Sequence, residues 1–241
     1  MSLFLTQSSI GRKLVMSITG LFLILFLTFH MCMNLVAILS AEGYNAICEF
    51  LGANWYALVG TAVLAAGFII HIIYAFWLTV QNRAARGADR YAVVDKPKDV
   101  EWASQNMLAL GIIMLAFLGL HLYHFWSKMQ LVDIIEMSGG DVCSQALENT
   151  TNGFYHIVNT FSSPINTLLY IIALAALWFH LSHGFWSALQ TIGFNNTTWF
   201  DRIKWIGRIW ATIVVLGFIV TIVMFFLDGF FGLNILPLLG A

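Results

Sequence analysis

Charged residues are scarce in this chain. Only 10% of its 241 residues are Asp, Glu, Lys or Arg, while 60% are hydrophobic and the mean hydropathy is +0.83. Soluble globular domains carry about 25% charged residues, so this composition excludes that class and predicts an integral membrane protein.

Several cofactor motifs are also absent. The sequence contains no C-x-x-C, no G-x-G-x-x-G and no G-x-x-x-x-G-K-[ST], which excludes iron–sulfur, dinucleotide and P-loop sites of these types. Cysteine itself is rare: Cys32 lies in an apolar run, whereas Cys48 and Cys143 lie in connecting segments. A disulfide between the last two has no geometric support in the sequence, so free thiols are the default expectation.

Five charge-free runs are each long enough to cross a hydrocarbon core of about 30 Å, which takes roughly 20 helical residues. Backbone polar groups in lipid must be satisfied within a segment, and runs of this length favour helices over the short alternating strands of a barrel. The first run is also much longer than the apolar core of a signal peptide. With no repeat or soluble second domain visible, the sequence predicts a single all-α domain over residues 1–241. We expect a five-transmembrane-helix bundle with helices at about Leu14 to Leu39, Ala57 to Val80, Met107 to Ser127, Pro164 to Gln190 and Ile209 to Leu227.

Basic residues lie almost entirely on one side of this expected bundle. Ten of the eleven Lys and Arg residues precede the first run, or lie between the second and third or the fourth and fifth runs. The segments on the other side carry several acidic residues and Lys128 as their one basic residue. The positive-inside rule therefore predicts a cytoplasmic N-terminus and a C-terminus outside.

Histidine is unusually frequent at predicted membrane depth. Of seven histidines, only His156 falls in a connecting segment; the others are His30, His71, His121, His124, His180 and His183. One membrane histidine is readily explained as a hydrogen-bonding group between helices. Four helices that each carry at least one indicate a functional site, because ionisable residues are costly in lipid.

Counted from the ends of the runs, four of these histidines form two level pairs. His30 and His121 fall in the outer half of the membrane, and His71 and His180 fall in the inner half. At 1.5 Å per residue the two levels differ by roughly 10 Å. Two histidines from different helices at one depth suit bis-imidazole ligation of a haem, so the pattern predicts two haems b. Zinc fits less well, because it takes about four ligands converging on one point.

Two histidines and two glycines accompany these candidates. His124 and His183 lie three residues after His121 and His180, and we expect them to hydrogen-bond haem propionates or backbone, or to be simply satisfied polar residues. Gly67 and Gly184 lie one turn from the inner candidates, where they either make room for a macrocycle or allow close helix contact.

These stretches together resemble a known family: the di-haem cytochrome b membrane anchor of succinate:quinone oxidoreductases and quinol:fumarate reductases, of the type with one anchor polypeptide. The resemblance rests on "SSIGRKLVMSITG", "FHMCMNLV", "IIHIIYAFW", "VEWASQNM", "GLHLYHFW" and "HLSHGFWSALQTIG", which extend from Ser8 to Gly193, about three quarters of the chain. By this resemblance, His30 and His121 bind one haem b, and His71 and His180 bind the other.

The resemblance also implies roles for less conspicuous residues. Lys13 and Ser17 would help to hold a haem propionate, although Lys13 equally serves as a topological charge and Ser17 as a group that bonds within its own helix. Glu49 is the nearest carboxylate to the position at which some relatives carry a proton acceptor for quinol oxidation. A solvated surface residue is its alternative interpretation.

The family function would be shared with other chains. A member passes electrons between an iron–sulfur subunit and membrane quinone, here expected to be menaquinone, and leaves succinate or fumarate chemistry to its partners. The implied partners are a flavoprotein and an iron–sulfur protein on the cytoplasmic face, near the basic segments from Arg83 to Lys98 and from Arg202 to Arg208. The resemblance further implies lipid contact, dimers of the complex, a multi-pass location in the bacterial cytoplasmic membrane and no nucleic-acid partner.

Other functions stay open at the level of sequence. One is the di-haem anchor of a hydrogenase or formate dehydrogenase; another is a transporter or proton channel with a histidine relay; a third is a structural anchor with hydrogen-bonding histidines. The segment "QLVDIIEM", residues 130–137, has helical apolar spacing and is expected to form an interfacial helix over the outer haem or a plain extracytoplasmic cover.

Overall fold

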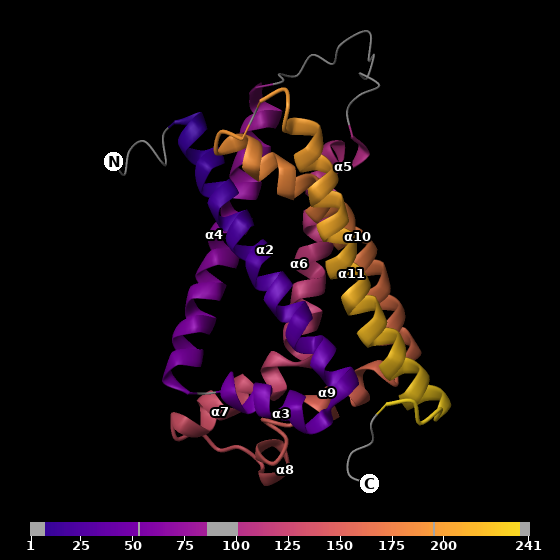
Figure 1. Ribbon diagram of the computed structural model, residues 1–241. Helices are drawn as coiled ribbons and strands as arrows, with labels where there is room; N and C mark the ends of the chain where they lie inside the picture. Colours follow the sequence, from indigo (N-terminus) through magenta and orange to yellow (C-terminus); the bar gives the residue numbers. More distant parts are fainter. Residues whose placement is uncertain (1–7, 53, 86–100, 195, 237–241) are drawn as a thin grey trace. The chain divides into compact units, whose positions relative to one another are not determined.

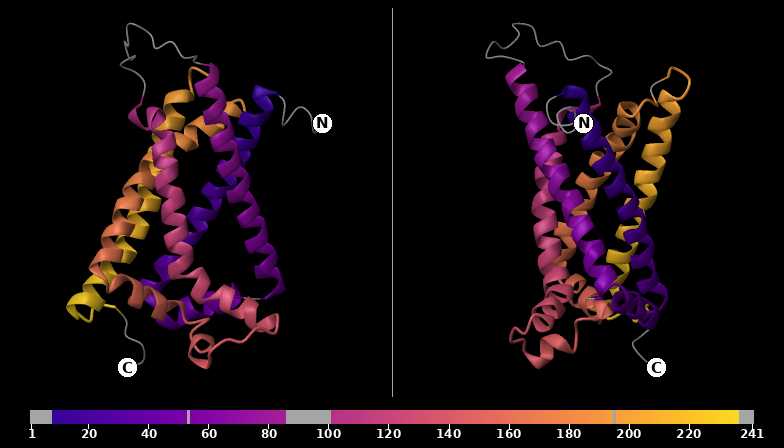
Figure 2. Two further views of the ribbon diagram at one scale, coloured as in Figure 1. Left: turned by 180° about the vertical axis from the view of Figure 1, so that it is seen from behind. Right: turned by 90° about the vertical axis from the view of Figure 1, so that its left-hand side faces the viewer.

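The computed structural model describes residues 8–52, 54–85, 101–194 and 196–236, and over these residues it is helical without strands (Figure 1). Five of the helices are long and apolar enough to cross a membrane, as the sequence predicted. They are α2 (Ser9–Leu39), α4 (Trp55–Ala85), α6 (Met107–His124), α10 (Pro164–Thr191) and α11 (Phe200–Phe231). This architecture is consistent with a multi-pass membrane protein, and each long helix is drawn as a continuous ribbon in the two views of Figure 2.

Three of these helices extend well beyond the predicted apolar runs. α2 begins at Ser9 instead of Leu14, α4 continues to Ala85, and α11 begins at Phe200 instead of Ile209. The added turns contain charged residues such as Arg83 and Lys204. A run counted as charge-free stops at the first such residue, whereas the backbone hydrogen bonding of a helix continues past it.

Short helices occupy the connecting segments. α7 (Gln130–Met137) confirms the helix predicted from "QLVDIIEM". Two other short helices have no counterpart among the predicted elements: α3 (Ala41–Phe50), whose N-cap Ser40 accepts a hydrogen bond from the Gly43 amide, and α9 (Gly153–Phe161), capped by Asn152. The remaining short elements are α5 (Trp102–Gln105), η1 (Trp126–Lys128) and α8 (Ser144–Leu147).

The chain divides into two compact units, each built from three separate stretches. The first unit comprises Met1–Phe26, Leu64–Ile112 and Leu177–Thr212, and the second comprises Leu27–Val63, Ile113–Ala176 and Ile213–Ala241. The long helices therefore contribute different turns to each unit.

Close helix contact holds the first unit together. α2 approaches α4 at Gly67, where an added Cβ would lie 2.7 Å from Cε1 of Phe22. α10 and α11 are joined by a hydrogen bond that Trp178 Nε1 donates to Thr212 Oγ1, 2.9 Å away. The guanidinium of Arg12 lies over the ring of Trp77, 5.3 Å from its centroid.

The short helices of the second unit gather at one end of it (Figure 1). α3 packs on α9, with the side-chain amide of Asn45 bonded to Asn152 Oδ1 and to the Phe154 amide. Gln130 of α7 is buried, and its side chain accepts hydrogen bonds from Thr61 and Trp126. All three cysteines are free, which confirms the default expectation for the thiols.

Candidate cofactor-binding sites

The first unit brings together His71 of α4 and His180 of α10. Their ring centroids are 6.4 Å apart and the ring planes meet at 64°. The two residues are 109 positions apart in the sequence, so the pair exists only because the two helices run side by side at this level.

His71 makes a specific contact with α2. Its Nδ1 lies 3.2 Å from Oγ1 of Thr19, and a Cβ added at Gly20 would lie 3.5 Å from its Cε1. One edge of the imidazole therefore faces the backbone of α2. Thr19 was not among the predicted site residues, because one threonine in an apolar helix gives no periodic signal.

The second unit brings together His30 of α2 and His121 of α6. The ring centroids are 5.8 Å apart and the rings are nearly perpendicular, at 86°. Asn34, one turn after His30, places its Nδ2 at 3.4 Å from His30 Nδ1 and donates a 2.8 Å hydrogen bond to the His30 carbonyl. The ring of Phe218, from α11, lies 5.7 Å from that of His30.

Aromatic side chains enclose His121. Phe117, Phe125 and Tyr170 have ring centroids between 5.1 and 6.2 Å from its own. This surrounding is apolar apart from the Tyr170 hydroxyl, which is directed to His124.

One histidine in each pair has an unsatisfied ring nitrogen. Nδ1 of His121 and Nδ1 of His180 are buried without a hydrogen-bond partner among the described residues. Buried polar atoms are normally satisfied, and an exception requires an explanation, for which a functional group is one candidate. Nδ1 of His183 and Oγ of Ser182 are further exceptions among the described residues, so the two predicted ligands are not alone in this property.

These distances fit one metal ion between each pair of rings. Because an imidazole nitrogen binds a metal at about 2 Å, two rings that ligate one iron from opposite sides have centroids roughly 6 Å apart. The observed 5.8 and 6.4 Å agree with that spacing. No group of three or more His, Cys, Asp or Glu side chains in the described parts of the chain is arranged to hold a metal, and an axially ligated haem needs only two.

The two additional histidines have different surroundings. His124 is buried, stacks on Tyr170 and places its Nδ1 at 3.1 Å from the tyrosine hydroxyl, as expected of a satisfied polar residue. His183 instead places its Nδ1 at 3.8 Å from Oε2 of Glu101, within ion-pair range but beyond hydrogen-bond distance.

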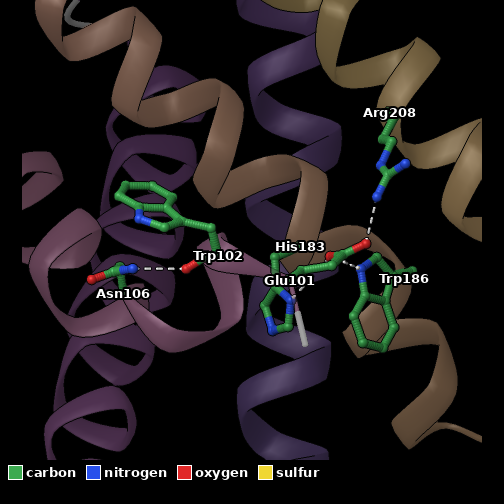
Figure 3. A network of polar contacts seen from close by, with 6 residues as sticks. All are labelled: Glu101, Trp102, Asn106, His183, Trp186 and Arg208. Atoms are coloured by element: carbon green, nitrogen blue, oxygen red, sulfur yellow. Dashed lines mark hydrogen bonds and ion pairs between the residues drawn. The ribbon is translucent and has the colours of Figure 1, made fainter. Parts of the chain in front are cut away.

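Glu101 is the centre of a polar cluster in the first unit that sequence analysis did not identify. Its carboxylate accepts hydrogen bonds from Arg208 of α11 and from Nε1 of Trp186 of α10, the latter at 3.2 Å, and Nδ1 of His183 lies nearest to the same oxygen as Trp186 (Figure 3). Lys204 lies over the Trp186 ring, 4.9 Å from its centroid. The cluster thus joins the residue before α5 to two long helices, one turn from His180.

The glycines flanking the first pair differ in role. Gly67 serves a helix contact, since a side chain there would meet Phe22. At Gly184 an added Cβ would meet no atom within 4 Å, so this face of α10 has room beside His180. Of the two interpretations offered for these glycines, the helix contact describes Gly67, and room for a flat group remains open for Gly184.

The other candidate residues lie as follows. Ser17 is buried and its hydroxyl donates to the Lys13 carbonyl at 2.9 Å, so its single hydrogen is used within α2; Lys13 itself is exposed. Glu49 lies exposed on α3. The structure thus gives Glu49 the surroundings of a solvated residue.

Outside the membrane-spanning helices, burial changes two further groups. Burial raises the pKa of the Cys48 thiol to about 11 and lowers the pKa of His156, whose Nε2 lies 2.9 Å from the Asn149 carbonyl. Both groups belong to the packing of α3 and α9.

Comparison of the chain with protein-family models, with curated proteins and with solved structures gave no match. The geometry therefore stands on its own: two pairs of histidines, each pair from two long helices and each inside one compact unit.

Proposed function

We propose that this chain is the membrane anchor and electron-transfer subunit of a succinate:quinone oxidoreductase or quinol:fumarate reductase. In this proposal His30 and His121 hold one haem b and His71 and His180 hold a second. Held by these residues, a haem would supply one-electron exchange between its ferric and ferrous states.

One observation carries the proposal. Four histidines from four helices form two facing pairs at 5.8 and 6.4 Å, the spacing that suits bis-imidazole ligation. A histidine relay would instead need a continuous chain of hydrogen bonds through the imidazoles. Nδ1 of His121 and Nδ1 of His180 have no hydrogen-bond partner in the described parts of the chain, so such a relay is interrupted at both pairs.

In this function the protein would position the two axial imidazoles of each pair and surround them with apolar side chains. Long helices carry the two imidazoles of each pair, and the rings of Phe117 and Phe125 provide apolar surroundings for His121. A dry surrounding and the hydrogen bonds to the imidazoles are the means by which a protein sets the potential of such a group.

The remaining parts of the proposal rest on the sequence. Positive charge predicts that the first unit's connecting segments face the cytoplasm of a bacterial cell, where flavoprotein and iron–sulfur partners would dock. Arg202, Lys204 and Arg208 belong to α11, and Arg83 to α4. The other basic residues of the proposed docking segment, Arg86, Arg90, Lys96 and Lys98, lie outside the described residues. Membrane quinone, expected to be menaquinone, would be the second electron partner, with Glu49 as the candidate proton acceptor.

The test is a reduced-minus-oxidised visible spectrum with haem quantitation on the purified full chain. We expect two b-type haems per polypeptide, and loss or perturbation of one of them in each of the variants His30→Ala, His71→Ala, His121→Ala and His180→Ala. His156→Gln, which alters a buried histidine outside both pairs, is the matched control and should retain both haems.

A colourless protein isolated with full haem supply would contradict the proposal. A coloured protein that co-purifies with hydrogenase or formate dehydrogenase subunits would instead assign the same cytochrome to another respiratory enzyme.

A further inference from the structure

Thr19 places its hydroxyl group against one of the paired histidines. Its Oγ1 lies 3.2 Å from Nδ1 of His71, and the contact joins α2 to α4 within the first unit. The hydrogen between these two atoms is covalently bound to one of them. Which atom carries it determines which ring nitrogen of His71 has the free lone pair.

The backbone of α2 determines which atom carries that hydrogen. A threonine hydroxyl has one hydrogen and two acceptor lone pairs. In Thr19 this hydrogen is directed to backbone carbonyls of the preceding turn, 2.9 Å away at Val15 and 3.1 Å away at Met16. Toward His71 the oxygen can then only accept, so Nδ1 carries the proton and Nε2 has the lone pair.

The imidazole of His71 also lies close to Gly20, the next residue of α2. A Cβ added at Gly20 would lie 3.5 Å from Cε1 of His71, which is an ordinary contact distance, so the imidazole edge lies directly against α2. His180, on the other side of the pair, has no such partner for its Nδ1 among the described residues. The two histidines of one pair therefore differ in how their rings are fixed.

We propose that Thr19 is a positioning residue for His71. Thr19 holds the imidazole of His71 in the Nδ1–H form, so that Nε2 is presented to the haem iron. The inference rests on the proposed function for the identity of the ligand, although the tautomer itself does not. A hydrogen bond from Nδ1–H makes the imidazole a stronger donor to the metal. It favours the ferric state and so lowers the midpoint potential of the haem bound at this pair.

The first experiment measures the tautomer without haem. Full-length chain labelled with ¹⁵N-histidine is prepared haem-free in detergent, and His71→Ala identifies the His71 resonances. We expect a protonated Nδ1 and an unprotonated Nε2 for His71 in the unmodified chain and in Thr19→Ser. Thr19→Val, which keeps the shape but removes the acceptor, should shift His71 toward the other tautomer.

The second experiment measures the haem-loaded chain. In Thr19→Val, one haem should show a raised midpoint potential and about 10- to 100-fold weaker retention, the usual range for loss of such a supporting hydrogen bond. Thr19→Ser should resemble the unmodified chain. Thr79→Val is the matched control, since the Thr79 hydroxyl also bonds back within its helix, to the Ala75 carbonyl at 2.7 Å.

The outcomes separate this inference from the proposed function. An Nε2-protonated His71 in the unmodified chain overturns the inference even where Thr19→Val does not fold. Two normal haems with unchanged potentials in Thr19→Val also overturn it and leave the proposed function standing. An unmodified chain that binds no haem refutes the proposed function, whatever tautomer His71 adopts.

Discussion

The cluster around Glu101 makes a quantitative prediction about the stability of the first unit. Glu101 binds Arg208 and Trp186 with its two carboxylate oxygens, so its removal leaves two donors without their acceptor. Removal of Arg208 leaves Glu101 still bonded to Trp186. The variant Glu101→Ala should therefore be more destabilising than Arg208→Ala.

The expected changes in the free energy of unfolding depend on how exposed the two side chains are. The side chains of Glu101 and Arg208 are 22% and 43% exposed, so the pair is neither fully buried nor fully solvated. Hydrogen bonds to charged groups contribute about 1.5–3 kcal/mol when buried, and exposed ion pairs contribute about 0.2–1 kcal/mol. We expect a coupling of about 1 kcal/mol between the two residues. Glu101→Ala alone should lower the free energy of unfolding by about 2 kcal/mol, because Trp186 also loses its partner.

The assay is a double-mutant cycle of Glu101→Ala and Arg208→Ala, with unfolding in detergent followed by tryptophan fluorescence. Asp201→Ala removes an exposed carboxylate from the start of α11 and controls for the change in net charge. Added salt should weaken the coupling only partly, since the pair is half-shielded. A coupling near zero, or equal losses in the two single variants, would refute the assignment of Glu101 as the shared acceptor.

Two further predictions concern the helices α3 and α9. Gly153→Ala should lower the free energy of unfolding by about 1–3 kcal/mol through overpacking, since the new Cβ would overlap the Cys48 thiol and lie 2.8 Å from Tyr44 Cε1. Adding Cys48→Ala to this variant should restore part of the lost stability. If the double variant recovers no stability, the contact with Cys48 is not the cause. Burial lowers the pKa of His156, so the folded state disfavours its protonation and the resulting stability is present above pH 6.5 and is lost as the pH falls below it. Stability should rise with pH, with a slope that is smaller in His156→Gln, as measured by unfolding titrations between about pH 7.5 and 5; equal slopes would contradict the prediction.

The sequence predicted the long helices better than it predicted their ends. Apolar runs show where a helix crosses lipid, because lipid excludes charge over that length. They are uninformative once the helix leaves lipid, as at the start of α11, where Asp201 and Lys204 belong to the helix. The short helices α3 and α9 were missed for a related reason: their stability comes from mutual packing and capping, which no run of apolar residues reveals.

For the histidine pairs, too, the sequence predicted one part and not another: it predicted the pairing but not the polar residues around each pair. Depth along each run was enough to predict which helices face one another, because each helix has a fixed rise per residue. It could not reveal Thr19, Asn34 or Glu101, whose contacts depend on how the helices are rotated toward one another. Polar residues that act on a paired histidine from another helix carry no periodic signal of their own.

The polar residues near His71 and near His30 differ, and this difference would affect the midpoint potentials of haems bound at the two pairs. His71 is held from a neighbouring helix by a hydroxyl that can only accept, whereas the amide of Asn34 lies one turn along from His30 on the same helix. The Asn34 atom that faces His30 is its amide nitrogen, which can only donate, so a hydrogen bond there would meet a lone pair on Nδ1 instead of a proton. Since the strength of the hydrogen bond at Nδ1 sets the donor strength of an imidazole, identical axial ligands at the two pairs need not produce identical potentials. Two sites with the same ligand set can thus differ in potential through residues that never touch the metal.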